Sequence, residues 1–259
     1  MRIDVLGVGF DDITVEQAAS RAYDLLISEG VTSGAMGDDP FDGKMAFVVT
    51  PNPEIVWTAR RNEALRNAMN GAVLVLPDGI GVVLGARILG SPLRGGRVPG
   101  IDFVSALFEK MAENGNSVFL LGAKPGVASA AGQNLAGKYQ GLKIAGASDG
   151  YFTDDEPVVR QINSSAPDLL LVCLGAPKQE LWMAKNISRL NVGLCAGLGG
   201  VLDVFAGNAK RAPVFFRTLG LEWFYRLVRE PRRIKRSIKL PLFVLVVVWT
   251  RIRGLFAPR

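Results

Sequence analysis

The chain contains no histidine, so a residue that removes a proton from a substrate hydroxyl must be of another type. Asp78 is the foremost candidate, because it directly follows a short apolar run in the segment PDGIG. A carboxylate at a strand end can act as a general base, although Pro-Asp-Gly is by itself also ordinary turn chemistry. The lack of histidine further excludes Ser-His-Asp and Cys-His catalysis and histidine metal sites.

Other polar and basic side chains follow apolar runs in the same way. Thr50 and Asn52 in TPNPE could orient a substrate, or could cap a helix that begins at Pro53. Arg97 lies in RGGRVPG, a basic glycine-rich segment that could close over a phosphate or remain a solvated loop. Gln179 and Glu180 in GAPKQE open a helix, where exposed first-turn residues would require no function.

Most of these turns combine glycine or proline with a helix start, where backbone N–H groups and the helix dipole attract phosphate. The pattern therefore suits a nucleotide diphosphate. The sequence GLGG at 197–200 is not a dinucleotide-binding motif, and the acidic residues are scattered. We accordingly predict chemistry without a metal ion or a cofactor.

Short apolar runs alternate with helical patterns through most of the chain. The predicted strands are Ala46–Val49, Val73–Leu76, Ser117–Leu121, Leu142–Ile144, Leu169–Leu174 and Gly193–Cys195. The predicted helices are Pro53–Met69, Ile101–Glu113, Val127–Tyr139, Glu156–Ser165 and Lys178–Ile187, and a capping box of Thr14 and Gln17 opens another. This rhythm predicts an α/β fold, a mostly parallel Rossmann-like sheet with helices on both faces, which binds ligands at the carboxyl ends of its strands. Gly30–Lys44, rich in glycine and aspartate, is predicted to be a loop.

Charge divides the 259-residue chain into two parts. Residues 210–259 hold 13 of the 30 Lys and Arg residues and two of the 24 acidic ones, so their formal charge is +11 and that of the remainder is −5. A basic segment on a mildly acidic body indicates an anionic partner, whether phospholipid, nucleic acid or a phosphorylated substrate. We predict an α/β catalytic domain over residues 1–211 and a basic helical appendage over residues 212–259.

The appendage contains an unbroken apolar run, Leu242–Trp249, between basic residues. Eight residues are too few for a helix to cross a bilayer, which takes about 20. The run suits shallow insertion at a membrane surface, or it could simply pack on the body. A nucleic-acid partner is disfavoured by so apolar a run.

Two further features concern the compartment. Cys173 and Cys195 both lie in apolar runs, which predicts buried thiols in a reducing environment. The amino terminus shows no basic stretch followed by an apolar one, as a secretory signal would. We expect a cytoplasmic body that is peripheral at the inner face of the cell membrane.

The motifs together resemble those of the WecG/TagA/CpsF glycosyltransferases, in the same order over nearly the whole chain. They are TPNPE (50–54), PDGIGV (77–82), RVPGID (97–102), GYF (150–152), GAPKQE (175–180), RAP (211–213), GLEWFYRL (220–227) and EPRR (230–233). The chain departs from the family pattern at Leu202, where an aromatic residue usually precedes the aspartate, and in a longer Gly30–Lys44 loop.

The resemblance implies an inverting, metal-independent transfer of an N-acetylmannosamine-type sugar from a UDP donor to a polyprenyl-diphosphate-linked GlcNAc. It implies that Asp78 is the catalytic base and that the substrate pocket contains Thr50, Asn52, Arg97 and Gln179. Tyr151 and Asp203 would lie near the uridine. The lipid diphosphate would be bound by Arg226, Arg233 and Arg236. The appendage would complete the active site and contact the membrane. The alternative hypothesis is a non-catalytic nucleotide-binding module, which the basic tail anchors to the membrane or to nucleic acid.

Overall fold

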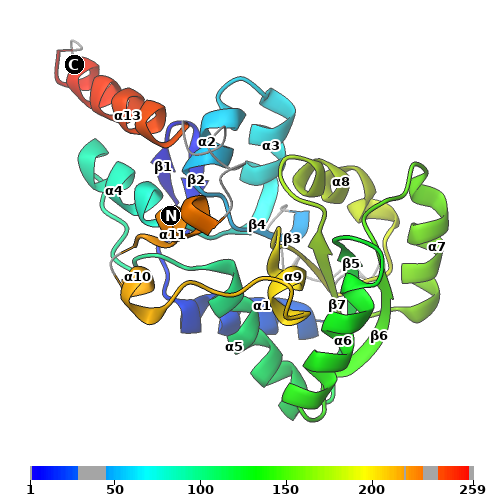
Figure 1. The fold of residues 1–259 in the computed structure, drawn as a ribbon. Coiled ribbons are helices and arrows are strands. Elements are labelled where there is room, and N and C mark those ends of the chain that lie inside the picture. The colour runs from blue at the N-terminus through cyan, green and yellow to red at the C-terminus, as the bar shows by residue number, and fades with distance from the viewer. Residues whose placement is uncertain (1, 29–44, 219, 230–238, 257–259) are drawn as a thin grey trace.

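The computed structural model describes residues 2–28, 45–218, 220–229 and 239–256. Its centre is a six-stranded sheet in the order β4-β3-β8-β7-β5-β6, in which every neighbouring pair is parallel (Figure 1). The strands are β3 (Met45–Val49), β4 (Ala72–Val75), β5 (Ser117–Gly122), β6 (Lys143–Ser148), β7 (Leu169–Cys173) and β8 (Leu194–Gly197). All six predicted strands, and the parallel α/β architecture, are confirmed.

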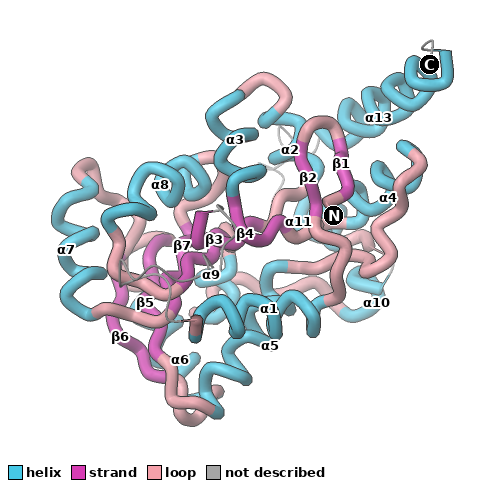
Figure 2. Tube along the Cα trace, turned by 180° about the vertical axis from the view of Figure 1, so that it is seen from behind, coloured by secondary structure: helices cyan, strands magenta, loops and turns pink. Residues whose placement is uncertain are grey.

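Helices cover both faces of this sheet, as predicted. One face packs against α1 (Val15–Ile27), α5 (Gly100–Glu113), α6 (Val127–Lys138) and α9 (Val201–Phe205). The other face packs against α2 (Pro53–Ala59), α3 (Glu63–Gly71), α7 (Asp155–Ser165), α8 (Lys178–Asn186) and the short 3-10 helix η1 (Ile187–Arg189). Figure 2 shows α1 and α5 side by side beneath the sheet. The capping box of Thr14 and Gln17 is present at the start of α1.

The prediction of one helix over Pro53–Met69 was wrong, because the structure has two. α2 ends at Ala59, and α3 begins at Glu63 with its own cap, since the Asn62 side chain accepts a hydrogen bond from the N–H of Leu65 at 3.0 Å. An apolar period continues across the break, so periodicity alone does not reveal it.

A hairpin and two helices were not predicted. β1 (Ile3–Val5) and β2 (Val8–Phe10) form an antiparallel hairpin whose two turn residues, Leu6 and Gly7, have φ values of 56° and 90°. Leucine seldom adopts a positive φ, so the turn carries no usual sequence signal. The two helices are α4 (Ile80–Leu89), which contains glycines that argue against a helix, and α9 (Val201–Phe205), which has only five residues.

The C-terminal segment consists of α10 (Val214–Thr218), α11 (Glu222–Arg229) and α13 (Lys239–Phe256). The apolar run 242–249 lies within α13, which packs against α4 and α2 through the buried side chains of Phe243 and Val247 and then projects from the body (Figure 1). None of the helices in the described part of the chain is long and apolar enough to cross a membrane. Gly30–Lys44 lies outside the described residues.

Both cysteines are buried thiols, as predicted. Burial raises the pKa of the Cys173 thiol from 9.0 to about 12, and it also raises the pKa of Cys195. Both therefore remain protonated at neutral pH, which makes them poor nucleophiles.

Candidate functional site

The ends of β3 and β4 bring Asp78 and Asn52 together. The two strands are parallel neighbours, and the loops that follow them are joined where the Asp78 N–H donates to the carbonyl of Pro51 at 3.2 Å. Asn52 caps α2, because its side-chain oxygen accepts from the N–H of Ile55 at 3.1 Å. Both residues nevertheless line one cavity of about 470 Å³, here called the Asp78 cavity. A carboxylate thus stands where a ligand can reach it.

Arg97 lines the same cavity, but its guanidinium group is paired with the C-terminal segment. Its Nη1 lies 2.5 Å from the Glu222 carboxylate, and its Nη2 donates to the carbonyl of Arg217 at 3.2 Å. Glu222 also lies 3.9 Å from Arg211, which binds Asp102 of α5 at 2.6 Å. These contacts hold α11 over the cavity, so Arg97 has a structural role besides the predicted phosphate contact.

Replacing Glu222 with glutamine is expected to loosen α11 from the body. The Arg97 and Glu222 side chains are only 17% and 14% exposed, so loss of the charge should weaken the contact by about 1–2 kcal/mol. Limited trypsin digestion should then cut between Arg211 and Lys239 about tenfold faster than in the unchanged protein.

Glu156→Gln is the matched control, because Glu156 pairs with Arg189 at an exposed place on α7. Digestion of Glu222→Gln at the rate of this control would show that the ion pair does not hold the segment.

Thr50 and Gln179 lie buried between the strand ends. Thr50 donates to the carbonyl of Gly197 at the end of β8 at 3.4 Å, and Gln179 accepts from the N–H of Gly199 at 2.9 Å. A Cβ added at Gly100 would lie 3.4 Å from the Thr50 hydroxyl, which shows how closely α5 approaches. Both side chains therefore bond to the backbone at the end of β8 and hold it against the neighbouring loops.

The expectation that Gln179 and Glu180 are exposed was wrong, because the first turn of α8 (Lys178–Asn186) faces the sheet and Glu180 is a buried carboxylate. It is 1% exposed, and its Oε1 accepts from the Gln179 amide at 2.9 Å, while its Oε2 makes no hydrogen bond to the described residues. Burial raises the pKa of this carboxyl above 4.5, because the charged form loses its hydration. The Gln179 side chain is thus oriented by Glu180 on one side and by Gly199 on the other.

The raised pKa of Glu180 makes the folded state bind a proton more tightly than the unfolded state does. Its contribution to the free energy of unfolding is therefore greatest below pH 4.5 and is lost as pH rises toward the pKa of the folded state. Glu180→Gln cannot ionise and keeps the acceptor oxygen, so its gain in stability over the unchanged protein should grow with pH.

Urea unfolding at pH values from 5 to 8 measures this difference. Glu63→Gln, at an exposed position on α3, should follow the unchanged protein at every pH. A difference for Glu180→Gln that stays constant with pH would contradict the assignment.

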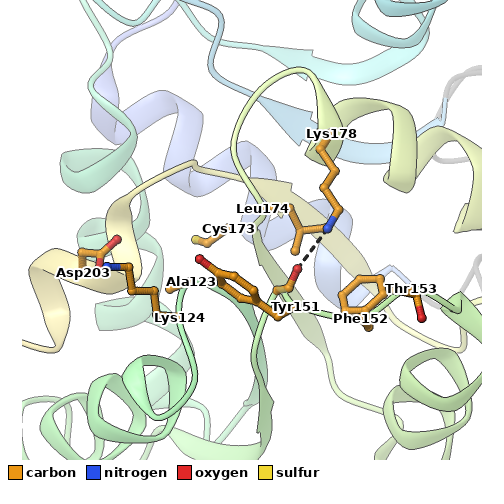
Figure 3. A pocket seen from close by; sticks show the side chains of 10 residues that line it. Ala123, Lys124, Tyr151, Phe152, Thr153, Cys173, Leu174, Lys178 and Asp203 are labelled. Carbon is orange, nitrogen blue, oxygen red and sulfur yellow. Dashed lines mark hydrogen bonds between the residues drawn. The ribbon is translucent and has the colours of Figure 1, made fainter. Parts of the chain in front are cut away.

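Tyr151 and Asp203 line a second cavity of about 570 Å³, here called the Tyr151 cavity, at the ends of β5, β6 and β7. Figure 3 shows Lys124 and Asp203 at one end of it, Tyr151 in the middle and Phe152 at the other end. The Tyr151 side chain is 70% exposed, so one ring face is open to a ligand.

The loops around the Tyr151 cavity are held by close backbone contacts. A Cβ at Gly122 would lie 2.3 Å from the carbonyl oxygen of Cys173, so only glycine allows β5 to pass β7 there. Lys178 donates to the carbonyl of Gly150 at 2.9 Å, a contact drawn in Figure 3, and lies 4.8 Å from the Phe152 ring centre. The cavity combines an exposed aromatic ring with two lysines, which suits a base joined to phosphates.

Several site residues were not found from the sequence. Lys124 and Lys178 stand in GAKPG and GAPKQE, which directly follow the apolar runs of β5 and β7, so their positions gave a signal. Glu222 stands in the motif GLEWFYRL, but its pairing with Arg97 gave no signal, because the two residues are 125 positions apart. Leu202, where the sequence departs from the family pattern, is fully buried in the core and does not line the Tyr151 cavity.

The predicted lipid-diphosphate arginines cannot be placed in the site. Arg233 and Arg236 lie outside the described residues, and the same holds for the side chain of Arg226, whose backbone belongs to α11. Within the described ranges, no three acidic, cysteine or histidine side chains are grouped as metal ligands would be.

Comparison with known proteins supplies the context for these two cavities. A sequence model described as "Glycosyl transferase WecG/TagA/CpsF family" matches residues 3–256. A protein of Bacillus spizizenii is 40% identical over 205 residues, which cover 79% of each chain. A protein of Bacillus subtilis is 37% identical over 203 residues, or 78% of this chain and 79% of the relative.

A protein of Staphylococcus aureus is 34% identical over 243 residues, which are 94% of this chain and 91% of the relative. All three relatives carry the name N-acetylglucosaminyldiphosphoundecaprenol N-acetyl-beta-D-mannosaminyltransferase.

Proposed function

The chain belongs to the WecG/TagA/CpsF family of glycosyltransferases, and we propose that it transfers an N-acetylmannosamine-type sugar from a UDP donor to a polyprenyl-diphosphate-linked GlcNAc. The product would serve the synthesis of a cell-surface polymer. Family membership favours this enzyme over a non-catalytic nucleotide-binding module. The names of the relatives support the acceptor and the mannosamine-type sugar.

The observation that carries the proposal is the pairing of two cavities along one edge of the sheet. The Asp78 cavity offers a carboxylate at the ends of β3 and β4, and the Tyr151 cavity offers an aromatic ring and lysines at the ends of β5, β6 and β7. An acceptor in the first and a nucleotide in the second would meet at the end of β8. Thr50 and Gln179 hold the loops there.

The proposed reaction inverts the configuration of the transferred sugar. Asp78 accepts the proton of the acceptor hydroxyl as its oxygen attacks the anomeric carbon. The bond between that carbon and the UDP oxygen breaks on the opposite face, and UDP leaves with the electron pair. A carboxylate suits the role of base in a chain that has no histidine.

Metal independence is part of the proposal. Lys124 in the Tyr151 cavity supplies positive charge for the departing diphosphate. Helix α6 begins three residues later, at Val127, and the positive end of its dipole would add to this charge. Turnover should therefore persist in the presence of EDTA.

We further propose that the protein acts as a peripheral protein at the inner face of the membrane. The apolar side chains on α13 and the excess of basic residues after Lys210 support this location. The proposed partners are thus the UDP-sugar, the lipid-linked acceptor and the lipid surface.

The test is an assay of the full chain with UDP-N-acetylmannosamine and a prenyl-diphosphate-linked GlcNAc. UDP should be released only when both are present, and NMR should show a β linkage in the product. An absence of acceptor-dependent UDP release would overturn the proposal for this substrate pair, and retention of the donor's configuration would overturn inversion.

Replacing Tyr151 with alanine is expected to weaken UDP binding about tenfold. Stacking of a base on an aromatic ring contributes about 1–3 kcal/mol. Isothermal titration calorimetry with UDP measures the change. Phe215→Ala is the control, because Phe215 is an equally exposed aromatic residue on α10. An unchanged Kd in Tyr151→Ala would place the uracil elsewhere.

A further inference from the structure

The Asp78 cavity has an apolar side that the transfer reaction leaves unexplained. Its polar lining residues are Asn52, Glu54, Asp78, Arg97 and Glu222. The apolar wall consists of six lining residues from α4, α11 and α13, namely Ile80, Leu84, Trp223, Leu240, Phe243 and Val244. A sugar and a diphosphate have no use for so much apolar surface. The wall suits an apolar part of a ligand.

The packing of α13 on α4 shows how this wall arises. Phe243 is 1% exposed and lies against Gly85, where an added Cβ would come within 3.1 Å of its ring. This close approach anchors α13, whereas its neighbour Val244 remains 46% exposed and lines the cavity together with Leu84 of α4, itself 48% exposed. The two helices therefore form a groove whose apolar walls are open to a ligand.

The chemistry of the proposed acceptor relates this groove to Asp78. In such an acceptor a single sugar and a diphosphate separate the attacking hydroxyl from the start of the prenyl chain. With that hydroxyl at Asp78, the first isoprene units must lie close to the cavity. The apolar wall is the part of the same cavity that can bury them, and burial of each methylene is favourable.

We propose that the groove between α4 and α13 binds the first isoprene units of the acceptor. This inference rests on the proposed function and extends it, because the enzyme would recognise the lipid chain as well as the sugar diphosphate. The nucleotide donor has no apolar tail, and its proposed place is the Tyr151 cavity. The groove is distinct from the outward side of α13, where Leu245 is 65% exposed and does not line the cavity.

The experiment uses soluble acceptors, GlcNAc diphosphates with tails of one, two or three isoprene units, in buffer without vesicles or detergent. For the unchanged protein, KM should fall about tenfold or more from the shortest to the longest tail, since each buried methylene contributes about 0.8 kcal/mol. The variant Leu84→Gln/Val244→Thr makes both walls polar with little change of shape. In this variant, most of the decrease in KM with tail length should be lost.

Val228→Thr is the matched control, because Val228 is 64% exposed on α11 and lies outside the cavity lining. It should show the full decrease in KM with tail length. Thermal unfolding should show that all variants are folded. The proposal is overturned if KM of the unchanged protein does not change with tail length. It is also overturned if the double variant shows the same decrease in KM with tail length as the unchanged protein. A protein that turns over none of the acceptors would overturn the transferase proposal as well.

Discussion

Asp78→Asn is expected to lower kcat by about 10²–10⁴-fold, the usual contribution of a general base. Asparagine has nearly the same shape but cannot accept the proton of the acceptor hydroxyl. The Asp78 N–H should still bond to the carbonyl of Pro51, so the loop should keep its course. Steady-state UDP release with saturating acceptor measures the change.

Two companion measurements separate a chemical role from a structural one. UDP binding to Asp78→Asn should be nearly unchanged, because the nucleotide is proposed to lie in the Tyr151 cavity. Asp24→Asn is the control, since Asp24 is exposed on α1, outside both cavities. A variant Asp78→Asn with normal kcat would assign the base to another residue.

Leu245→Gln/Trp249→Gln is expected to lower partition onto anionic vesicles by about 100-fold or more. The two side chains are 65% and 50% exposed one helical turn apart on α13, and burial of such side chains is worth about 1.5–3 kcal/mol each. Glutamine keeps the helix and the charge unchanged, so the loss reports the two apolar side chains, including the Trp249 ring on which Arg253 lies at 3.7 Å. Vesicle sedimentation measures it.

Ile27→Gln is the matched control, because Ile27 is 52% exposed on α1, far from α13 in Figure 1, and should bind vesicles normally. Salt gives a second check. Raising the salt to 1 M shortens the screening length to about 3 Å and should remove the electrostatic part of binding, while the apolar part remains. Normal partition of the double variant would show that α13 does not insert.

The arrangement of the cavities suggests how docking and chemistry are joined. The helix proposed to touch lipid also forms one wall of the Asp78 cavity, through Phe243 and Val244. Glu222 holds the preceding helix α11 over the same cavity by its contact with Arg97. If α13 lies at the membrane as we propose, an acceptor drawn from the lipid would enter the cavity beside the helix that contacts the lipid.

Local sequence features determined the sheet, its covering helices and the place of the candidate base. Apolar runs such as Leu169–Leu174 predict buried strands because both faces must avoid water, and the capping box of Thr14 and Gln17 joins residues three apart. Asp78 could be assigned to a strand end for the same reason. Such patterns involve near neighbours in the chain, so the sequence alone displays them.

Only the tertiary structure decided which residues meet. Arg97 pairs with Glu222, and α13 lies against α4, because side chains far apart in the sequence pack together in the folded chain. The hairpin turn at Leu6 is likewise held in an unusual conformation that local preference opposes. Asp78 was thus a candidate base from the sequence, but its place in a cavity with an apolar wall depends on long-range packing that local patterns do not encode.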